Sequence, residues 1–178
     1  LFNMVVNPVN GDVYVSNTDA SNHIRFEGPG RHGGSTVQGQ IAKAQITTIN
    51  QSGVTVQPLN THIDYSVLKA SDTVKQHSIA TPLDMAVTRD GSTLYVAALG
   101  SDKVAVYNTS HLSGAIDAET ASTNHISVSG GPMGLWLDEA NNRLYVLTHF
   151  DHALVTVDTR TSREISRVRL SSPEPASV

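Results

Sequence analysis

The 178-residue sequence contains no cysteine, so disulfides, cysteine-ligated metals and cysteine nucleophiles are excluded within it. Charged residues make up only 16% of it and the net charge is −4, so we expect no basic surface and no nucleic-acid partner. No apolar run reaches the roughly 18–20 residues of a membrane-spanning helix, and no membrane span is expected. These absences exclude a disulfide scaffold, a nucleic-acid-binding protein and a helical membrane protein.

Familiar catalytic motifs are also missing. The sequence has no Gly-x-Ser-x-Gly elbow, no His-Glu-x-x-His motif and no EF-hand calcium loop. Most aspartates stand among the polar residues of expected turns, where aspartate commonly hydrogen-bonds the backbone. We therefore expect no catalytic residue and no cofactor within this chain, and interpret it as non-catalytic on its own.

What the sequence does contain is a repeat built on three Tyr-Val pairs, which begin at Tyr14, Tyr95 and Tyr145. Each pair follows a short apolar strand and a polar turn, and two of the turns carry Asn-Gly or Asp-Gly, which tolerate the positive φ of tight hairpins. Third strands are expected at 104–109 and 154–159, and fourth strands at 125–129 and 164–170. Four short antiparallel strands per unit, with units about 40–50 residues apart, predict an all-β β-propeller.

The repeat divides the chain into blades. Residues 1–81 form a blade-like unit with long loop insertions at 22–40 and 61–76. Residues 82–131 and 132–172 form the second and third blades, and 173–178 are expected to lead into a further one. Closed propellers have about four to eight blades. We therefore expect three four-stranded blades of a larger propeller, which either a longer polypeptide or further copies of this chain would complete.

The first insertion carries the most distinctive candidate site. It gathers His23, Arg25, Glu27, Arg31 and His32 around the stretch "FEGPGRHGG". Glycines let backbone amides approach an anion, and arginines bind carboxylate or phosphate in a bidentate manner. The spacing matches no phosphate-binding fingerprint. The set is a candidate ligand- or partner-binding site, and the alternative is a structural loop.

Three further residues are candidates by position. Asp84 follows Pro82 at the start of an expected innermost strand, from which it would face the central channel. His149 and His152 flank Asp151 and are weak candidates for a metal site, and the alternative there is a solvated turn. His77 and His125 are expected to lead into fourth strands at equivalent positions of the repeat, without forming a pair.

The stretches "TPLDMAVTRDGSTLYVAALGSDKVAVYNT" and "GGPMGLWLDEANNRLYVLTHFDHALVTVDT" resemble the YVTN-type β-propeller repeat. The resemblance covers residues 81–170 closely and 1–57 more loosely. It implies a radial arrangement of four-stranded blades and carries little information about function, because propellers support many unrelated activities.

A narrower resemblance rests on "LFNMVVNPVNGDVYVSNTDASNHIRFEGPG", "NTHIDYS" and "SSPEPASV". These stretches are similar to the propeller portion of large bacterial secreted proteins fused to c-type cytochrome sequence. The resemblance implies a periplasmic, secreted or cell-surface location, and haem c in a downstream segment, since this chain has no Cys-x-x-Cys-His motif.

We therefore expect a non-catalytic scaffold or binding domain. Its expected partners are the rest of the same polypeptide, other copies of this chain or a cytochrome domain with a role in electron transfer. The alternatives are an enzyme with a metal site in the propeller channel and a cell-surface structural or adhesion module.

Overall fold

The computed structural model describes residues 1–20, 42–67, 70–112 and 124–170. Within these residues the chain forms three four-stranded antiparallel sheets, each with its strands in chain order. The first sheet comprises β1 (Asn3–Val6), β2 (Val13–Ala20), β3 (Ala42–Asn50) and β4 (Gly53–Pro58). The second comprises β5 (Pro82–Val87), β6 (Thr93–Ala98), β7 (Lys103–Asn108) and β8 (His125–Ser127). The third comprises β9 (Pro132–Asp138), β10 (Arg143–Thr148), β11 (Ala153–Asp158) and β12 (Arg163–Arg169).

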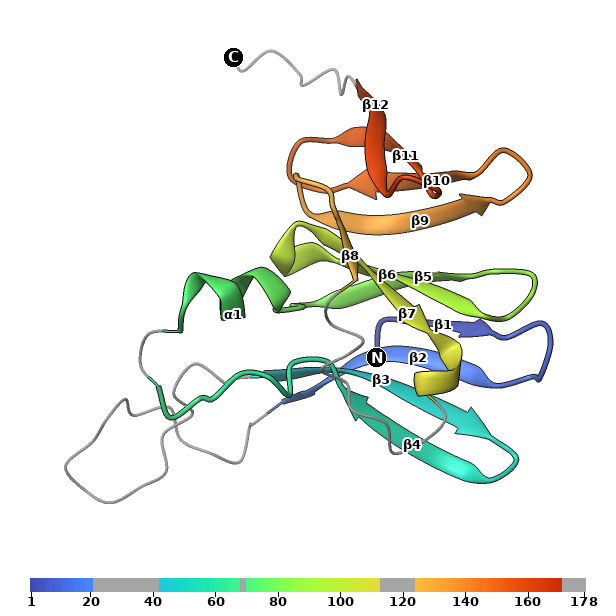
Figure 1. Ribbon diagram of the computed structural model, residues 1–178, viewed down its shortest axis with the longest axis vertical. Helices are drawn as coiled ribbons and strands as arrows, with labels where there is room; N and C mark the ends of the chain where they lie inside the picture. The colour runs from blue at the N-terminus through green and yellow to red at the C-terminus, as the bar shows by residue number, and fades with distance from the viewer. Residues whose placement is uncertain (21–41, 68–69, 113–123, 171–178) are drawn as a thin grey trace, which may run out of the picture.

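The three sheets stack face to face as consecutive blades, as Figure 1 shows. Their first strands lie side by side in the order β1, β5, β9, so these are the innermost strands of the arc. The prediction of four-stranded antiparallel blades is confirmed, and the predicted strand starts at 104, 125, 154 and 164 agree with the structure to within one residue.

The hairpin between the first two strands of each blade has the expected turn chemistry. Gly11 has φ of 76° and Gly91 has φ of 69°, and both positive values are ones that glycine adopts without steric cost. Asn142 takes the same role in the third blade with φ of 54°. The dipeptides that predicted these turns therefore act through backbone conformation.

Two hydrophobic layers hold the blades together. Between the first and second blades, Tyr14 packs with Leu94 and Val96, and all three side chains are fully buried. Between the second and third blades, Tyr95 packs with Leu144 and Val146 in the same way. Tyr14 and Tyr95 thus face the following blade, while the apolar residues on either side of Tyr95 and Tyr145 face the preceding one.

The segment between β4 and β5 departs from the repeat. It contains the short helix α1 (Asp72–His77), capped by Ser71, whose hydroxyl accepts a hydrogen bond from the Val74 amide at 3.3 Å. Asp72 in the first turn and His77 in the last suit the helix dipole. The prediction that His77 leads into a fourth strand is therefore wrong, because the fourth strand of this blade has already ended at Pro58.

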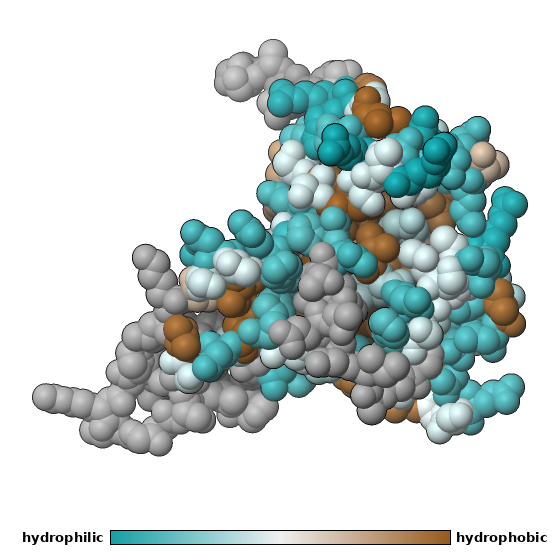
Figure 2. All heavy atoms as spheres, in the orientation of Figure 1, coloured by the Kyte–Doolittle hydropathy of each residue, from teal (hydrophilic) through white to brown (hydrophobic). Residues whose placement is uncertain are grey.

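Hydrophobic side chains also reach the surface of the stack, where Figure 2 shows them as brown spheres among teal polar ones. Seventeen large hydrophobic residues of the described ranges are exposed, and most belong to the first and third blades. Among the same ranges, no helix is long and apolar enough to cross a membrane.

Candidate functional site

One end of the blades carries two of the three longest connections and is here called the insertion face. It comprises the segment 59–81, the turns 99–102 and 149–152, and the connection 128–131. The opposite end, the hairpin face, carries the tight turns 7–12, 88–92 and 139–142. Figure 1 shows α1 on the side away from the hairpin turns. The paired residues Ala20 and Ala42 also end β2 and begin β3 at the insertion face.

The first insertion departs from this pair of strand ends. Its five candidate residues, His23, Arg25, Glu27, Arg31 and His32, lie outside the described residues. Anion or partner binding by this set stays a prediction. What the structure adds is the place from which the insertion leaves the blade.

Asp84 lies on β5, where its carboxylate joins the innermost strands of all three blades. One carboxylate oxygen, Oδ2, accepts a hydrogen bond from the backbone amide of Leu135 on β9 at 2.7 Å. The other, Oδ1, accepts hydrogen bonds from the Met85 amide at 2.9 Å and from the side-chain amide of Asn3 on β1. The geometry thus gives Asp84 an anchoring role between blades, and ligand binding by this residue stays a prediction.

His149 and His152 lie on the exposed turn between β10 and β11. Their rings are 6.4 Å apart in a T-shaped arrangement, and His152 has a positive φ of 47°. The intervening Asp151 directs its carboxylate to Arg167. Among the described residues, no three or more histidine or acidic side chains gather in a way that could hold a metal ion. Metal binding at this turn stays a prediction.

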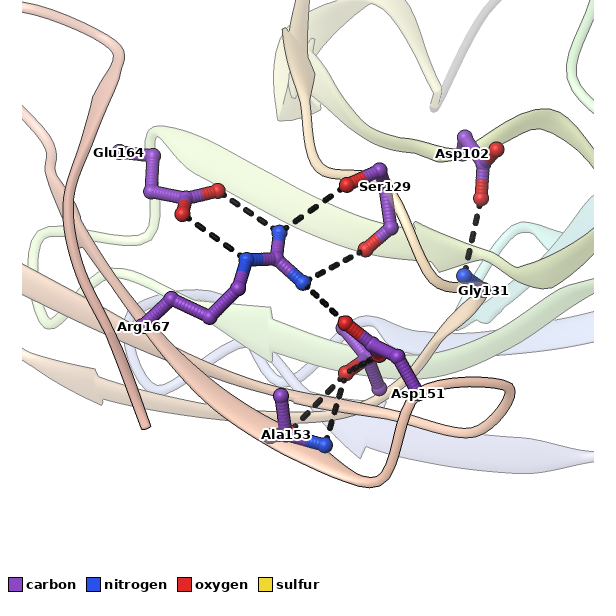
Figure 3. A network of polar contacts seen from close by, with 8 residues as sticks. Asp102, Ser129, Gly131, Asp151, Ala153, Glu164 and Arg167 are labelled. Carbon is purple, nitrogen blue, oxygen red and sulfur yellow. Dashed lines mark hydrogen bonds and ion pairs between the residues drawn. The ribbon is translucent and has the colours of Figure 1, made fainter. Parts of the chain in front are cut away.

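Arg167 on β12 is the centre of a polar network that Figure 3 shows from close by. Its guanidinium donates to Asp151 Oδ2 at 2.6 Å and to both carboxylate oxygens of Glu164, at 3.0 and 2.8 Å. It also donates to the backbone and hydroxyl oxygens of Ser129 at 3.2 Å. The network fixes the outermost strand of the third blade to the connection from the second blade.

One of the two acidic partners of Arg167, Asp151, has a shifted pKa. The pKa of Asp151 lies below its ordinary value because Thr148 donates a hydrogen bond to its carboxylate and Arg167 adds a hydrogen bond and a positive charge. In the preceding turn, Asp102 Oδ1 accepts from the Gly131 amide at 2.9 Å (Figure 3). Both aspartates therefore stabilise the connection between the second and third blades.

A row of three histidines crosses the outer edge of the insertion face. The ring of His77 lies 6.3 Å from that of His62 and 6.3 Å from that of His125, edge to face in both cases. The Nδ1 atoms of His62 and His125 are buried without a hydrogen-bond partner. Burial, followed by the nearby charges of Lys103 and His77, lowers the pKa of His125. The expectation that His77 and His125 form no pair is wrong, because α1 brings their rings together.

Lys103 fixes α1 to the second blade. Its ammonium donates to the backbone carbonyls of Gln76 and, at 3.0 Å, of Ser78, where the helix ends. A cation at this position also complements the helix dipole. Partial burial lowers the pKa of Lys103. The lysine therefore serves as a structural clamp on the segment that carries His77.

A pocket of about 210 Å³ lies between β3, the end of β4 and the start of the segment 59–81. Lys43, Pro58, Ile63 and Tyr65 are among the residues that line it. Burial raises the pKa of Tyr65. Lys43 and Tyr65 contribute one ammonium group and one phenol to the lining of the pocket.

Comparison with known proteins supports the fold. No protein-family model matches the chain, and no curated protein matches it either. Among solved structures, it is similar to hydrazine synthase from Kuenenia stuttgartiensis, with 17% identity and a TM-score of 0.63 over 89% of this chain and 45% of that one.

Two other solved structures show the same likeness. One is a putative 6-phosphogluconolactonase from Bacteroides fragilis, with 14% identity and a TM-score of 0.50 over 96% of this chain and 57% of that one. The other is the WD40 repeats of RRP9, with 13% identity and a TM-score of 0.50 over 93% and 37%. WD40 repeats form β-propellers. At these identities the likeness shows the β-propeller fold alone, and the chain spans about half or less of most of these proteins.

Proposed function

We propose that this chain is a non-catalytic scaffold and binding domain that presents its insertion face to a protein partner. The observation that carries the proposal is how the connections are distributed between the two ends of the blades. The hairpin face carries three short turns and one long connection, the one that follows Asn108, whereas the segment 59–81 and the point where residues 22–40 leave the blade share the insertion face. On rigid scaffolds, long loops are the usual place for binding residues.

The arrangement of charged groups also supports a scaffold. The charged groups of Asp84 and Arg167 bind other parts of the blades. Lys103 holds α1 in the same way. These groups stabilise the surface from which the loops project, so the binding chemistry would come from the insertions, including the arginines and histidines of 22–40.

A location in the periplasm, in the secreted fraction or at the cell surface is part of the proposal, as is a cytochrome domain elsewhere in the polypeptide. Both rest on the resemblance of the sequence to cytochrome-linked propeller proteins. The absorption spectrum of the native protein tests the second point. A Soret band that stays with the polypeptide under denaturing conditions would support covalent haem, and a haem-free native protein would contradict it.

The binding role is tested by shortening one loop at each end of the blades. Residues 22–40 are replaced by a short turn, and in a matched control residues 113–123, which join β7 to β8 at the hairpin end, are replaced in the same way. The far-ultraviolet circular dichroism of both variants shows whether the blades still fold. We expect native partners to be lost on capture with the first variant and retained with the second. Equal retention by both variants would contradict the proposal.

A further inference from the structure

No described segment of the chain covers the outward faces of the first and third blades, although they carry the same side chains that pack between blades elsewhere. Tyr14 and Tyr95 are 0% and 8% exposed, because each lies against the following blade. Tyr145 occupies the equivalent position in the third blade and is only half-buried. Its cross-strand neighbour Trp136 is 64% exposed and lies 5.6 Å from it, ring to ring.

At the first blade it is the other face of the sheet, the one opposite the tyrosine, that is exposed. Leu94, Val96, Leu144 and Val146 flank the second and third tyrosines and are fully buried against the preceding blade. Val13 and Val15 flank the first tyrosine and remain partly exposed. The pairing of strands places a set of exposed apolar side chains around these two valines: Met4, Val6, Ile49, Val54 and Val56.

Inside the arc, the tyrosine face of one blade packs on the opposite face of the next blade. The exposed face of the third blade is a tyrosine face, and that of the first blade is the kind of face on which a tyrosine face packs. The tyrosine face of the third blade continues through Leu147, Leu154 and Val168, which pair across β10, β11 and β12. Side chains of this size and apolarity on a contiguous sheet face are the mark of an interaction surface. Within the described residues, neither of these two faces packs against a neighbouring blade, whereas the equivalent faces of the other blades do.

We propose that these faces are covered by further blades of the same polypeptide. The following blade would lay the apolar residues of its second strand on Tyr145 and Trp136, and the preceding one would lay its tyrosine face on Val13 and Val15. Both interfaces inside this chain join consecutive blades of one polypeptide in that orientation. The solved propellers to which it is similar are also about twice its length, since it covers 45% and 57% of two of them. This inference adds a specific interface to the proposed function and does not depend on what the insertion face binds.

Oxidative footprinting of the protein as its source makes it tests the inference directly. Trp136 is the only tryptophan of the sequence, so its labelling is read from one peptide. Tyr14 serves as the buried reference, and Val9, 67% exposed in the hairpin turn 7–12, serves as the exposed one. We expect Trp136 to lose its labelling as Tyr14 does. Labelling at the rate of Val9, after scaling to the intrinsic reactivities of the two side chains, would overturn the proposal.

The source of the covering blade is decided by two further readouts on the same sample. We expect a denatured mass well above 19.0 kDa, and we expect photo-cross-links from the region of Trp136 to peptides outside residues 1–178. Cross-links to the Val13 and Val15 face of another copy, with a denatured mass of 19.0 kDa, would overturn the proposal in favour of a ring closed by two chains. Because footprinting uses the unaltered protein, no variant has to fold for the test to decide.

Discussion

The carboxylate of Asp84 on β5 accepts a hydrogen bond from the backbone amide of Leu135 on β9, with 2.7 Å between oxygen and nitrogen. The same carboxylate binds Asn3 on β1. One side chain therefore bridges three innermost strands that are distant in the sequence. A position that the sequence pattern directs toward the central channel sets the spacing of the blades.

Replacing Asp84 should therefore destabilise the fold. A hydrogen bond to a charged group contributes about 1.5–3 kcal/mol, so we expect Asp84→Ala to lower the free energy of unfolding by about 2 kcal/mol. Asp84→Asn should cost less, because the amide keeps one acceptor oxygen. Urea denaturation measures both. Asp72→Ala is the control: its side chain is 90% exposed, and we expect a change below about 0.5 kcal/mol. Unchanged stability in Asp84→Ala would contradict the anchoring role.

The Arg167 network predicts that arginine and lysine are not equivalent at this position. Arg167 uses three guanidinium nitrogens at once to reach Glu164, Ser129 and Asp151. A lysine offers one ammonium, which cannot span the same partners. We expect Arg167→Lys to lower the free energy of unfolding by about 1 kcal/mol and to speed hydrogen exchange along β12. Arg160→Lys, at an exposed turn, is the matched control, and equal effects of both substitutions would contradict the network.

Asp151 should contribute to acid sensitivity. Its pKa is lowered in the folded state by Thr148 and Arg167, so the unfolded chain binds its proton first. The resulting stability is complete above the ordinary aspartate pKa of about 3.9 and is lost as the pH falls through the lower folded value. We expect Asp151→Asn to flatten the dependence of stability on pH below about pH 4. Denaturation curves between pH 2 and pH 6 test this, and an unaltered slope would show that Asp151 does not contribute.

His125 should make the stability of the fold depend on pH in a higher range than Asp151 does. Its pKa is lowered by burial and by Lys103 and His77, so the stability linked to it is complete above the ordinary histidine pKa of about 6.5 and falls as the pH drops below that value. We expect His125→Gln to reduce the loss of stability between about pH 7 and pH 5. His149→Gln, at an exposed turn, should leave that loss unchanged. If the two variants behave alike, the histidine row does not control this transition.

Two leucines on β10 test which faces are covered. Leu144 is fully buried between blades, whereas Leu147 is 37% exposed on the outward face. In residues 1–178 expressed alone, we expect Leu144→Ala to lower the free energy of unfolding by about 2–5 kcal/mol and Leu147→Ala to cost much less. In the native protein a covering blade should raise the cost of Leu147→Ala. Thermal denaturation of both forms measures the difference, and an equal cost for Leu147→Ala in both would contradict a covering blade.

Residues that act through local pattern could be predicted from the sequence. The Tyr-Val pairs and the turn dipeptides predicted the strands and the four-stranded blades. Alternation along each strand then determines which side chains point to a neighbouring blade. Tyr14 and Tyr95 follow this rule, and the strand that carries Asp84 was predicted by the same pattern.

Residues that act through contacts distant in the sequence could not be predicted from the sequence. The bridge from Asp84 to Leu135 spans 51 positions, and nothing in the local pattern indicates it. The histidine row depends on α1, whose six residues are too few to give a helical period. The sequence pattern therefore predicts that His77 leads into a fourth strand, and its approach to His62 and His125 follows from the position of α1 against the second blade.

The central claim is that a partner binds at the insertion face, and hydrogen exchange of the native protein with and without its captured partner tests it most directly. We predict slower exchange in the segment 59–81 and in the turns 99–102 and 149–152, with no change in the hairpin turns 7–12, 88–92 and 139–142. Protection confined to the hairpin turns, or to β1, β5 and β9 around Asp84, would contradict the account and place the functional site at the other face or in the channel.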